Sequence, residues 1–170
     1  MASDLLKRLQ SWRASVGAQM PTPNPHYDSN RQGQQPPART TEQPISTPLG
    51  TISASSHQRG NPPHHSVDGT PSTRWAASNG TVPQWVQLDL GKQCQLAGVE
   101  IRFKNRTAIH YAVSVSNDAR EWKTVHESNK ASPIQNEKAL FSRDARFLRV
   151  TINKVQSGWA TIEDWKPIFP

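Results

Sequence analysis

Hydrophobic and polar residues alternate with a period of two through most of the chain beyond about residue 49. Such an alternation places apolar side chains on one face of an extended strand and polar ones on the other. The alternating runs are residues 85–90, 98–103, 111–115 and 148–152. The expected turns between strands are residues 90–92, 116–118, 142–144 and 156–158. This pattern predicts an all-β domain, an antiparallel sandwich or barrel, over residues 49–170.

The strand pattern also predicts which side chains form the core. The inward-facing positions are Val86, Leu88, Leu90, Val99, Ile101, Phe103, Tyr111, Val113, Val115, Leu148, Val150 and Ile152. Trp75, Trp85, Trp122 and Trp165 are also expected to pack in the core or at strand ends, whereas Trp159 follows a glycine in a loop. About 120 residues are enough for one such core.

Residues 3–17 follow a helical period instead. The apolar positions Leu5, Leu6, Leu9, Trp12 and Val16 fall on one face. Ser3 is suited to the N-cap and Gly17 to the C-terminal position, so a short amphipathic helix is predicted. A helix this short is marginally stable unless its apolar face is covered.

Residues 18–48 join the helix to the β domain. They contain half of the chain's 14 prolines, set among Gln, Thr, Asn and Ser, with few large apolar residues. Such a composition buries too little apolar surface to offset the entropy of ordering the backbone. The segment is predicted to be an extended linker.

Charge and composition exclude several classes of protein. The net charge of +7 favours contact with polyanions, but no basic stripe interleaved with aromatic residues indicates nucleic acid. The apolar runs are too short to span a membrane. Residues 76–84 offer only Val82 as an apolar loop residue, so no membrane insertion is expected.

No catalytic motif is present. His64 and His65 do not form HExxH, neither GxSxG nor a P-loop occurs, and the six histidines lack zinc spacing. The single cysteine, Cys94, excludes an internal disulfide framework. The chain is therefore not expected to be an enzyme.

One turn-rich segment carries the oxygen atoms of a cation site. Asp68 and Thr73 flank a DGTPS loop, and Glu163 provides a carboxylate near the C-terminus. Carboxylate and hydroxyl oxygens, with loop carbonyls, are the ligands that Ca²⁺ takes in proteins. A site built from these residues would hold the two ends of the domain together.

Six blocks of sequence resemble a known family. They are VDGTPSTRW, QWVQLDLGK, GVEIRF, YAVSVSNDAREW, ARFLRVTI and GWATIEDW. In this order, over residues 47–170, the chain resembles a discoidin domain, the coagulation factor V/VIII type C domain. Bacterial members of this family are largely family 32 carbohydrate-binding modules. The resemblance implies a β-sandwich of the jelly-roll, galactose-binding type.

The resemblance also implies a structural Ca²⁺ site. Asp68, Thr73 and Glu163 match the family's side-chain ligands. Backbone oxygens near His65, Thr70 and Ile162 would complete the coordination shell. An ion enclosed by protein oxygens leaves no open position for catalysis.

The glycan site that the resemblance implies is less complete. Galactose-binding members often carry a histidine and a second tryptophan just after the TxW motif, where this chain has Ala76 and Ala77. Trp159 is placed to stack on a pyranose ring. Further candidate ligand-binding residues are Asn105, Arg106, Lys104, Asn79 and Arg74. Their basic side chains favour a sulfated or carboxylated polysaccharide, because hydrogen bonds to oxyanions are strong when the donor is charged.

A second resemblance concerns residues 3–28, which are similar to the C-terminal end of a bacterial arylsulfatase-type sulfatase. It implies that the module is the appendage of a polysaccharide-directed sulfatase, and that an upstream catalytic domain is its partner. Such a parent enzyme would be secreted or periplasmic. The sulfatase Cys-x-Pro/Ala-Ser-Arg segment is absent here.

A protein-docking discoidin domain that binds no sugar is the alternative function. Burial of Trp159 would favour that alternative, and its exposure would favour glycan binding.

Overall fold

The computed structural model describes residues 45–170, the side chains of Asn105 and Arg106 excepted. The predicted helix 3–17, most of the linker 18–48 and the sulfatase-like segment 3–28 lie outside the described residues. The strands are β1 Ile45–Thr47, β2 Gly50–Ala54, β3 Trp75–Ala76, β4 Gln84–Thr107, β5 Ile109–Ser116, β6 Lys123–Ser128, β7 Ile134–Val155 and β8 Thr161–Ile168. A 3-10 helix, η2, spans Pro63–Ser66.

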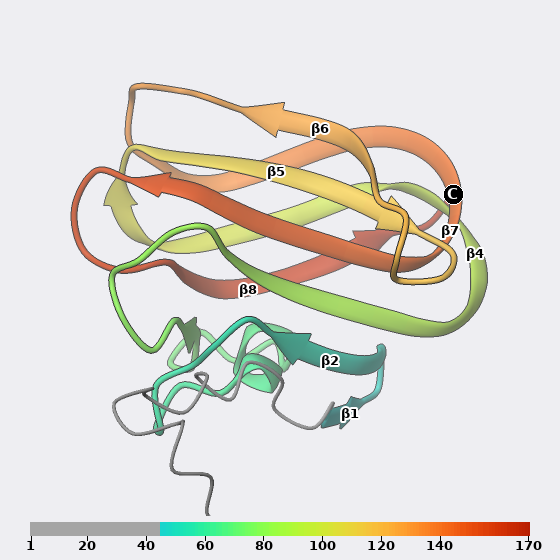
Figure 1. The fold of residues 1–170 in the computed structure, drawn as a ribbon, viewed down its shortest axis with the longest axis horizontal. Helices are drawn as coiled ribbons and strands as arrows, with labels where there is room; N and C mark the ends of the chain where they lie inside the picture. The colour runs from blue at the N-terminus through green and yellow to red at the C-terminus, as the bar shows by residue number, and fades with distance from the viewer. Residues whose placement is uncertain (1–44) are drawn as a thin grey trace, which may run out of the picture. The chain divides into compact units, whose positions relative to one another are not determined.

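The strands form an antiparallel β-sandwich in which β4 and β7 belong to both layers. The first half of β4 pairs with β2 and with the second half of β7, which also pairs with β5. The second half of β4 pairs with β8 and with the first half of β7. Figure 1 shows β4 bending back at one end of the sandwich. The predicted all-β fold is confirmed.

Two of the four expected turns are bends inside long strands. Residues 90–92 lie within β4, where Gly91 has a φ of 76° and the pairing register with β7 shifts between Asp89 and Cys94. Residues 142–144 lie within β7, opposite that bend. Because both strands bend together, their hydrogen bonding continues from one layer into the other.

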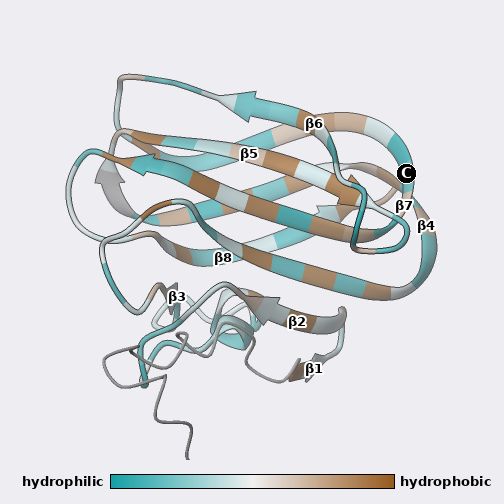
Figure 2. Cartoon of the chain, in the orientation of Figure 1, coloured by the Kyte–Doolittle hydropathy of each residue, from teal (hydrophilic) through white to brown (hydrophobic). Residues whose placement is uncertain are grey.

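The core between the layers follows the predicted alternation. Eleven of the twelve expected core residues are buried, and the other, Leu90, is partly buried against the same cluster. Figure 2 shows the alternation of hydrophobic and hydrophilic residues along the long strands. Trp75 and Trp165 are fully buried, and each indole N–H is satisfied: Trp75 donates to the Ser56 carbonyl at 2.9 Å and Trp165 to Ser66 Oγ at 3.2 Å.

The sandwich begins earlier than the sequence pattern indicates. Ile45–Thr47 pairs with Gly50–Ile52 as an edge hairpin, so the end of the expected linker belongs to the sheet. Within residues 45–170, none of the helical segments has the length and apolar character needed to cross a membrane.

Candidate functional site

Four connecting segments meet at one end of the sandwich, around Trp159. The Ala77 amide donates to the Ala160 carbonyl at 2.9 Å, and the Gln156 amide donates to the Ala108 carbonyl at 3.0 Å. The Ser78 amide donates to Ser56 Oγ at 3.2 Å, which joins the loop after β2 to the same group. We call this end, made of residues 55–62, 77–83, 104–108 and 156–160, the loop end.

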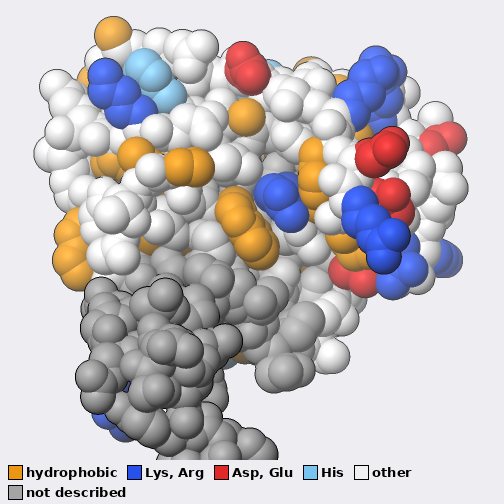
Figure 3. All heavy atoms as spheres, in the orientation of Figure 1, with side chains coloured by type: hydrophobic (Ala, Val, Ile, Leu, Met, Phe, Trp, Pro, Cys, Tyr) orange, Lys and Arg blue, Asp and Glu red, His pale blue; other side chains and the backbone are white. Residues whose placement is uncertain are grey.

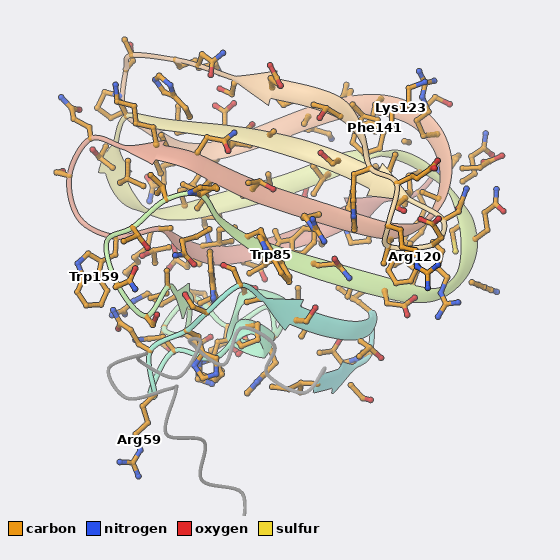
Figure 4. The ribbon with its side chains drawn as sticks, in the orientation of Figure 1. Arg59, Trp85, Arg120, Lys123, Phe141 and Trp159 are labelled. Atoms are coloured by element: carbon orange, nitrogen blue, oxygen red, sulfur yellow. The ribbon has the colours of Figure 1, made fainter. Side chains whose placement is uncertain are left out.

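Trp159 is presented on the surface of the loop end. It follows Gly158, whose φ of 84° suits a glycine, and its carbonyl accepts a hydrogen bond from Thr161 Oγ1 at 3.0 Å. The residue is 43 % exposed although the loop on either side of it is anchored. Figure 4 shows its indole projecting from the edge of the domain. An anchored indole with an exposed surface is suited to stacking.

The loop that carries Asn79 borders Trp159. A Cβ atom at Gly80 would lie 3.9 Å from Trp159 Cδ1 and Nε1, an ordinary van der Waals contact. Asn79 Oδ1 accepts hydrogen bonds from the Thr81 amide at 2.9 Å and from Thr81 Oγ1 at 2.5 Å. The Asn79 side-chain oxygen therefore holds the turn, and its NH₂ group is the part suited to a ligand.

Two other candidate ligand residues lie along the same end. Asn105 and Arg106 are at the end of β4, next to Thr107, whose hydroxyl lies 3.3 Å from Ser157 Oγ. This contact brings the backbone of residues 105–107 beside the Trp159 loop. Arg74 is partly exposed and precedes β3. The structure thus brings together the segments of Trp159, Asn79 and residues 105–107, whereas Arg74 lies outside the loop end as defined above.

The predicted cation ligands of the DGTPS loop converge on one hydroxyl group. Thr73 Oγ1 lies 2.9 Å from both carboxylate oxygens of Asp68, 2.9 Å from the Thr70 carbonyl and 3.5 Å from the His65 carbonyl. The hydroxyl has one hydrogen, so it can donate to only one of these four oxygens at a time. An oxygen-rich cluster of this kind fits a hard cation.

Glu163, the predicted ligand from β8, contacts cationic side chains. The residue is 7 % exposed. Its Oε2 lies 3.3 Å from Arg102 Nε, and its Oε1 lies 3.6 Å from Lys104 Nζ. Ile162, the adjacent predicted ligand, pairs with Trp75 in β3 and with Phe103 in β4. The DGTPS loop and β8 are therefore linked through the short β3 strand.

Asp164 is a site residue that sequence reasoning missed. Burial raises the pKa of its carboxyl group, and the negative charge of Asp68 adds to that rise. The charges of Arg102 and Lys166 and a hydrogen bond from the Gly69 backbone oppose it. Two carboxylates near each other are relieved by a cation, so Asp164 adds negative charge where Asp68 and Thr73 gather their oxygens.

The chemistry of this donor set fits Ca²⁺ better than a transition metal. Among residues 45–170, no three His, Cys, Asp or Glu side chains form a group able to hold a metal. A cation at the DGTPS loop would depend on carbonyl and hydroxyl oxygens together with Asp68. Hard cations accept such ligands, whereas zinc prefers nitrogen and sulfur.

The architecture is that of a two-layered β-sandwich with a loop-borne surface at one end. The chain belongs to the F5/8 type C domain family, which matches residues 51–165. No curated protein matches the chain. The discoidin resemblance of the sequence is therefore confirmed, and the sulfatase resemblance stays a prediction.

Solved structures share this fold at low sequence identity. Chitosan-binding module 2 of the chitosanase/glucanase from Paenibacillus sp. IK-5, in complex with chitotriose, is 24% identical with a TM-score of 0.65, covering 71% of this chain and 96% of that chain. The family 32 module of AlyQ, in complex with 4,5-unsaturated mannuronic acid, is 24% identical with a TM-score of 0.62, covering 76% and 98%. The family 32 module of NanJ from C. perfringens, in complex with galactose, is 22% identical with a TM-score of 0.61, covering 69% and 91%.

Proposed function

We propose that residues 49–170 form a non-catalytic carbohydrate-binding module that holds a polysaccharide at the loop end. The observation that carries this proposal is the 43 % exposure of Trp159 in a loop that hydrogen bonds anchor. An exposed aromatic side chain on a rigid loop pays little conformational entropy when a sugar ring stacks on it. Exposure of Trp159 also favours glycan binding over the docking alternative.

The ligand class that we propose is a carboxylated or sulfated glycan. Lys104 and Arg106 belong to the loop end, Arg74 precedes β3, and the chain carries a net charge of +7. Charge-assisted hydrogen bonds to oxyanions are the strongest that these side chains make. The mannuronic acid bound by the AlyQ module is a ligand of this class on the same fold.

We also propose that Ca²⁺ stabilises the module. Asp68, Thr73 and the carbonyls of His65 and Thr70 would hold the ion, with Glu163 and the Ile162 carbonyl contributed by β8. The ion would supply positive charge to the oxygen atoms around Thr73, among which the hydroxyl group can donate only one hydrogen bond. Its effect would be structural, through the connection between the DGTPS loop and β8.

A bound cation would also change the charge near the glycan surface. Glu163 now lies between Arg102 and Lys104, at 3.3 and 3.6 Å. If Glu163 served as a cation ligand, its charge would be shared and Lys104 would be more available to an anionic ligand. The proposal therefore links Ca²⁺ to affinity for acidic glycans.

The wider context that we propose is the C-terminal appendage of a secreted or periplasmic sulfatase. Its support is the resemblance of residues 3–28 to the end of an arylsulfatase-type enzyme. The test is complementation: an arylsulfatase-type catalytic domain that lacks its last helix should recover soluble, folded protein when a peptide of residues 1–28 is added. No recovery would contradict this context and leave the module's function unaffected.

Affinity electrophoresis tests the binding function. The full chain should be retarded in gels that contain alginate or pectin, and the retardation should weaken at high salt without vanishing. Trp159→Ala should abolish it. Phe169→Ala removes an aromatic residue of similar exposure, 47 %, and should leave the retardation unchanged.

The outcomes separate the alternatives. Retardation of the wild type that Trp159→Ala retains would place the glycan surface elsewhere. No retardation by any glycan would overturn the proposal and favour the docking domain.

A further inference from the structure

A pocket lies at the end of the sandwich opposite to Trp159. Its volume is about 440 Å³, within the range of ligand sites. The turn between β5 and β6 and the bend of β7 enclose it, with Asn117, Glu121, Trp122, Lys123, Arg143 and Asp144 in its lining. Figure 4 shows Arg120 and Lys123, which flank Trp122 in sequence, at the end away from Trp159. We call this the turn end.

Trp122 is the aromatic side chain of the turn end. Its indole N–H donates to the Ala119 carbonyl at 3.1 Å, and the Arg149 guanidinium lies 3.7 Å from its ring centroid. The same guanidinium lies 4.6 Å from the Trp85 ring and donates to Gln87 Oε1. Figure 3 shows hydrophobic and basic side chains together near the middle of the face that carries Trp85 in Figure 4. Trp122 is thus held firmly while it remains partly exposed.

The turn that carries Trp122 is also fixed. Asp118 Oδ1 accepts hydrogen bonds from Ser116 Oγ at 3.0 Å, from the Arg120 amide at 2.8 Å and from the Glu121 amide at 3.0 Å. These hydrogen bonds lower the pKa of Asp118, and the two from the backbone amides of Arg120 and Glu121 contribute most. The pocket is therefore built before any ligand arrives, which reduces the entropic cost of binding.

The polar side chains of the pocket are separated from one another. Two carboxylates, Glu121 and Asp144, and two cations, Lys123 and Arg143, share the lining. These four described residues form no ion pair with each other within 4.0 Å. Carboxylates and basic groups spaced around an aromatic side chain provide acceptors and donors for the hydroxyl groups of a sugar.

We propose that the turn end is a second saccharide-binding subsite, which takes a neutral pyranose. The ring would lie against Trp122, and its hydroxyl groups would bond to Glu121, Asp144, Lys123 and Arg143. A mixture of both charge signs selects a neutral polyhydroxylated ligand, whereas a polyanion would meet the two carboxylates. Together with a glycan site at the loop end, this subsite would make the module bivalent. The bivalence rests on the proposed function, because it requires the loop end to bind a glycan.

Two sites at opposite ends have a further consequence. One short oligosaccharide cannot reach both tryptophans when they lie at opposite ends of the sandwich. The two ends would instead join two glycan segments, and binding to a dense matrix would exceed either single affinity.

Indole N–H resonances in a ¹⁵N-labelled full chain distinguish the two sites. Trp122→Phe and Trp159→Phe assign the two signals. The neutral probes are cellotriose and N-acetylchitotriose, and the acidic probe is an alginate trisaccharide. We expect the neutral probes to shift the Trp122 signal and the acidic probe to shift the Trp159 signal.

Charge-neutralising variants test the lining without disturbing the stack on Arg149. The double variant Glu121→Gln/Asp144→Asn keeps side-chain size and should weaken the neutral-probe titration of Trp122 by about tenfold or more. Glu127→Gln, on exposed β6, is the matched control and should have no effect. Thermal melting verifies that each variant is folded.

Each result decides the inference. A Trp122 signal unmoved by millimolar neutral probes, or moved equally in the double variant, overturns the second subsite. If only Trp159 responds, the proposed function stands and this inference fails. If only Trp122 responds, the loop end is the wrong site and the turn end is confirmed. If neither indole responds to any probe, the proposed function and the second subsite both fail.

Discussion

The two ends of the sandwich each present a partly exposed tryptophan, but they hold it in different ways. At the turn end, Trp122 is stacked on Arg149 at 3.7 Å and carried by a turn closed on Asp118. At the loop end, Trp159 depends on contacts between loops that are distant in sequence, such as Ala77 with Ala160. Local hydrogen bonds and one cation–π stack order the first end, and long-range loop packing orders the second.

This difference indicates where stability and ligand specificity reside. The Gly69 backbone, within the Asp68–Thr73 oxygen cluster, hydrogen bonds to Asp164 of β8, so a cation would act on β8, which follows the Trp159 loop. The turn end has its own stabilising contacts and should be insensitive to that ion. The segments of the loop end include the basic residues Arg59, Lys104 and Arg106, and both signs of charge line the turn end.

Removing the Arg149 stack should cause the largest change and should affect the turn end. Arg149→Ala loses two ring contacts and the hydrogen bonds to Gln87. We expect a loss of about 2 to 4 kcal/mol of unfolding free energy in urea titrations. Arg149→Lys should recover only part of it, because lysine lacks the planar fork. A loss below about 0.5 kcal/mol would show that the stack does not order this end.

Calcium should stabilise the loop end by a smaller amount. Saturating Ca²⁺ should raise the melting temperature of the chelator-treated chain by several degrees, since a ligand of the native state alone stabilises it. Asp68→Asn should abolish the rise. Asp118→Asn, the same change in the turn end, should lower stability but retain the full response to Ca²⁺. An identical melting temperature with and without Ca²⁺ would refute the metal site.

Affinity for an acidic glycan should depend on Ca²⁺ through Lys104. We expect binding of an alginate oligosaccharide to be about three- to tenfold weaker in chelator than in Ca²⁺, as calorimetry would measure. Lys104→Ala should weaken binding in Ca²⁺ and reduce this ratio towards one. Lys138→Ala, which removes a lysine paired with Glu100 at 3.4 Å, is the control and should leave the ratio intact. An undiminished ratio in Lys104→Ala would contradict the link through Glu163.

Acidification should change the contributions of Asp89 and Asp164 to stability with opposite signs. The side-chain hydrogen bonds of Arg146 lower the pKa of Asp89, so this carboxylate stabilises the fold above the unfolded pKa of about 3.9 and loses that contribution as pH falls through its folded pKa. Burial raises the pKa of Asp164, so its ionisation destabilises the fold as pH rises.

Two variants measure these contributions. Asp89→Asn should lower the melting temperature at pH 7 by on the order of 2 °C, and the difference should vanish near pH 3. In chelator, Asp164→Asn should raise the melting temperature at pH 7 and have no effect below about pH 4. Effects of the same sign at both sites would contradict the opposite pKa directions.

The sequence was sufficient to predict the layers of the fold but not the path of its strands. The faces of residues 85–90 and 98–103 follow from period-two alternation, because one-sided burial requires it. The continuity of β4 through Gly91 does not follow from the alternation, since a glycine at positive φ is equally typical of a hairpin turn. Residues 142–144 were predicted as a turn because the polar sequence Ser-Arg-Asp is typical of one, yet β7 continues through them.

The candidate site was predicted where its chemistry is local and missed where it depends on register. Asp68 and Thr73 are five residues apart, and their contact follows from a turn. The contacts of Glu163 with Arg102 and Lys104 arise from a register shift between β4 and β8 after Arg102. Asp164 pairs in register with Arg102, but its hydrogen bond from the Gly69 backbone joins segments far apart in the chain, and no periodic pattern in the sequence encodes it.

The most direct test of the account is calorimetric titration of the full chain with an alginate trisaccharide in Ca²⁺, for the wild type, Trp159→Ala and Phe169→Ala. We predict that Trp159→Ala weakens binding by about thirtyfold or more, as expected for loss of an aromatic hot spot, while Phe169→Ala binds like the wild type. Equal affinity of the wild type and Trp159→Ala would contradict the claim that the loop end holds the glycan.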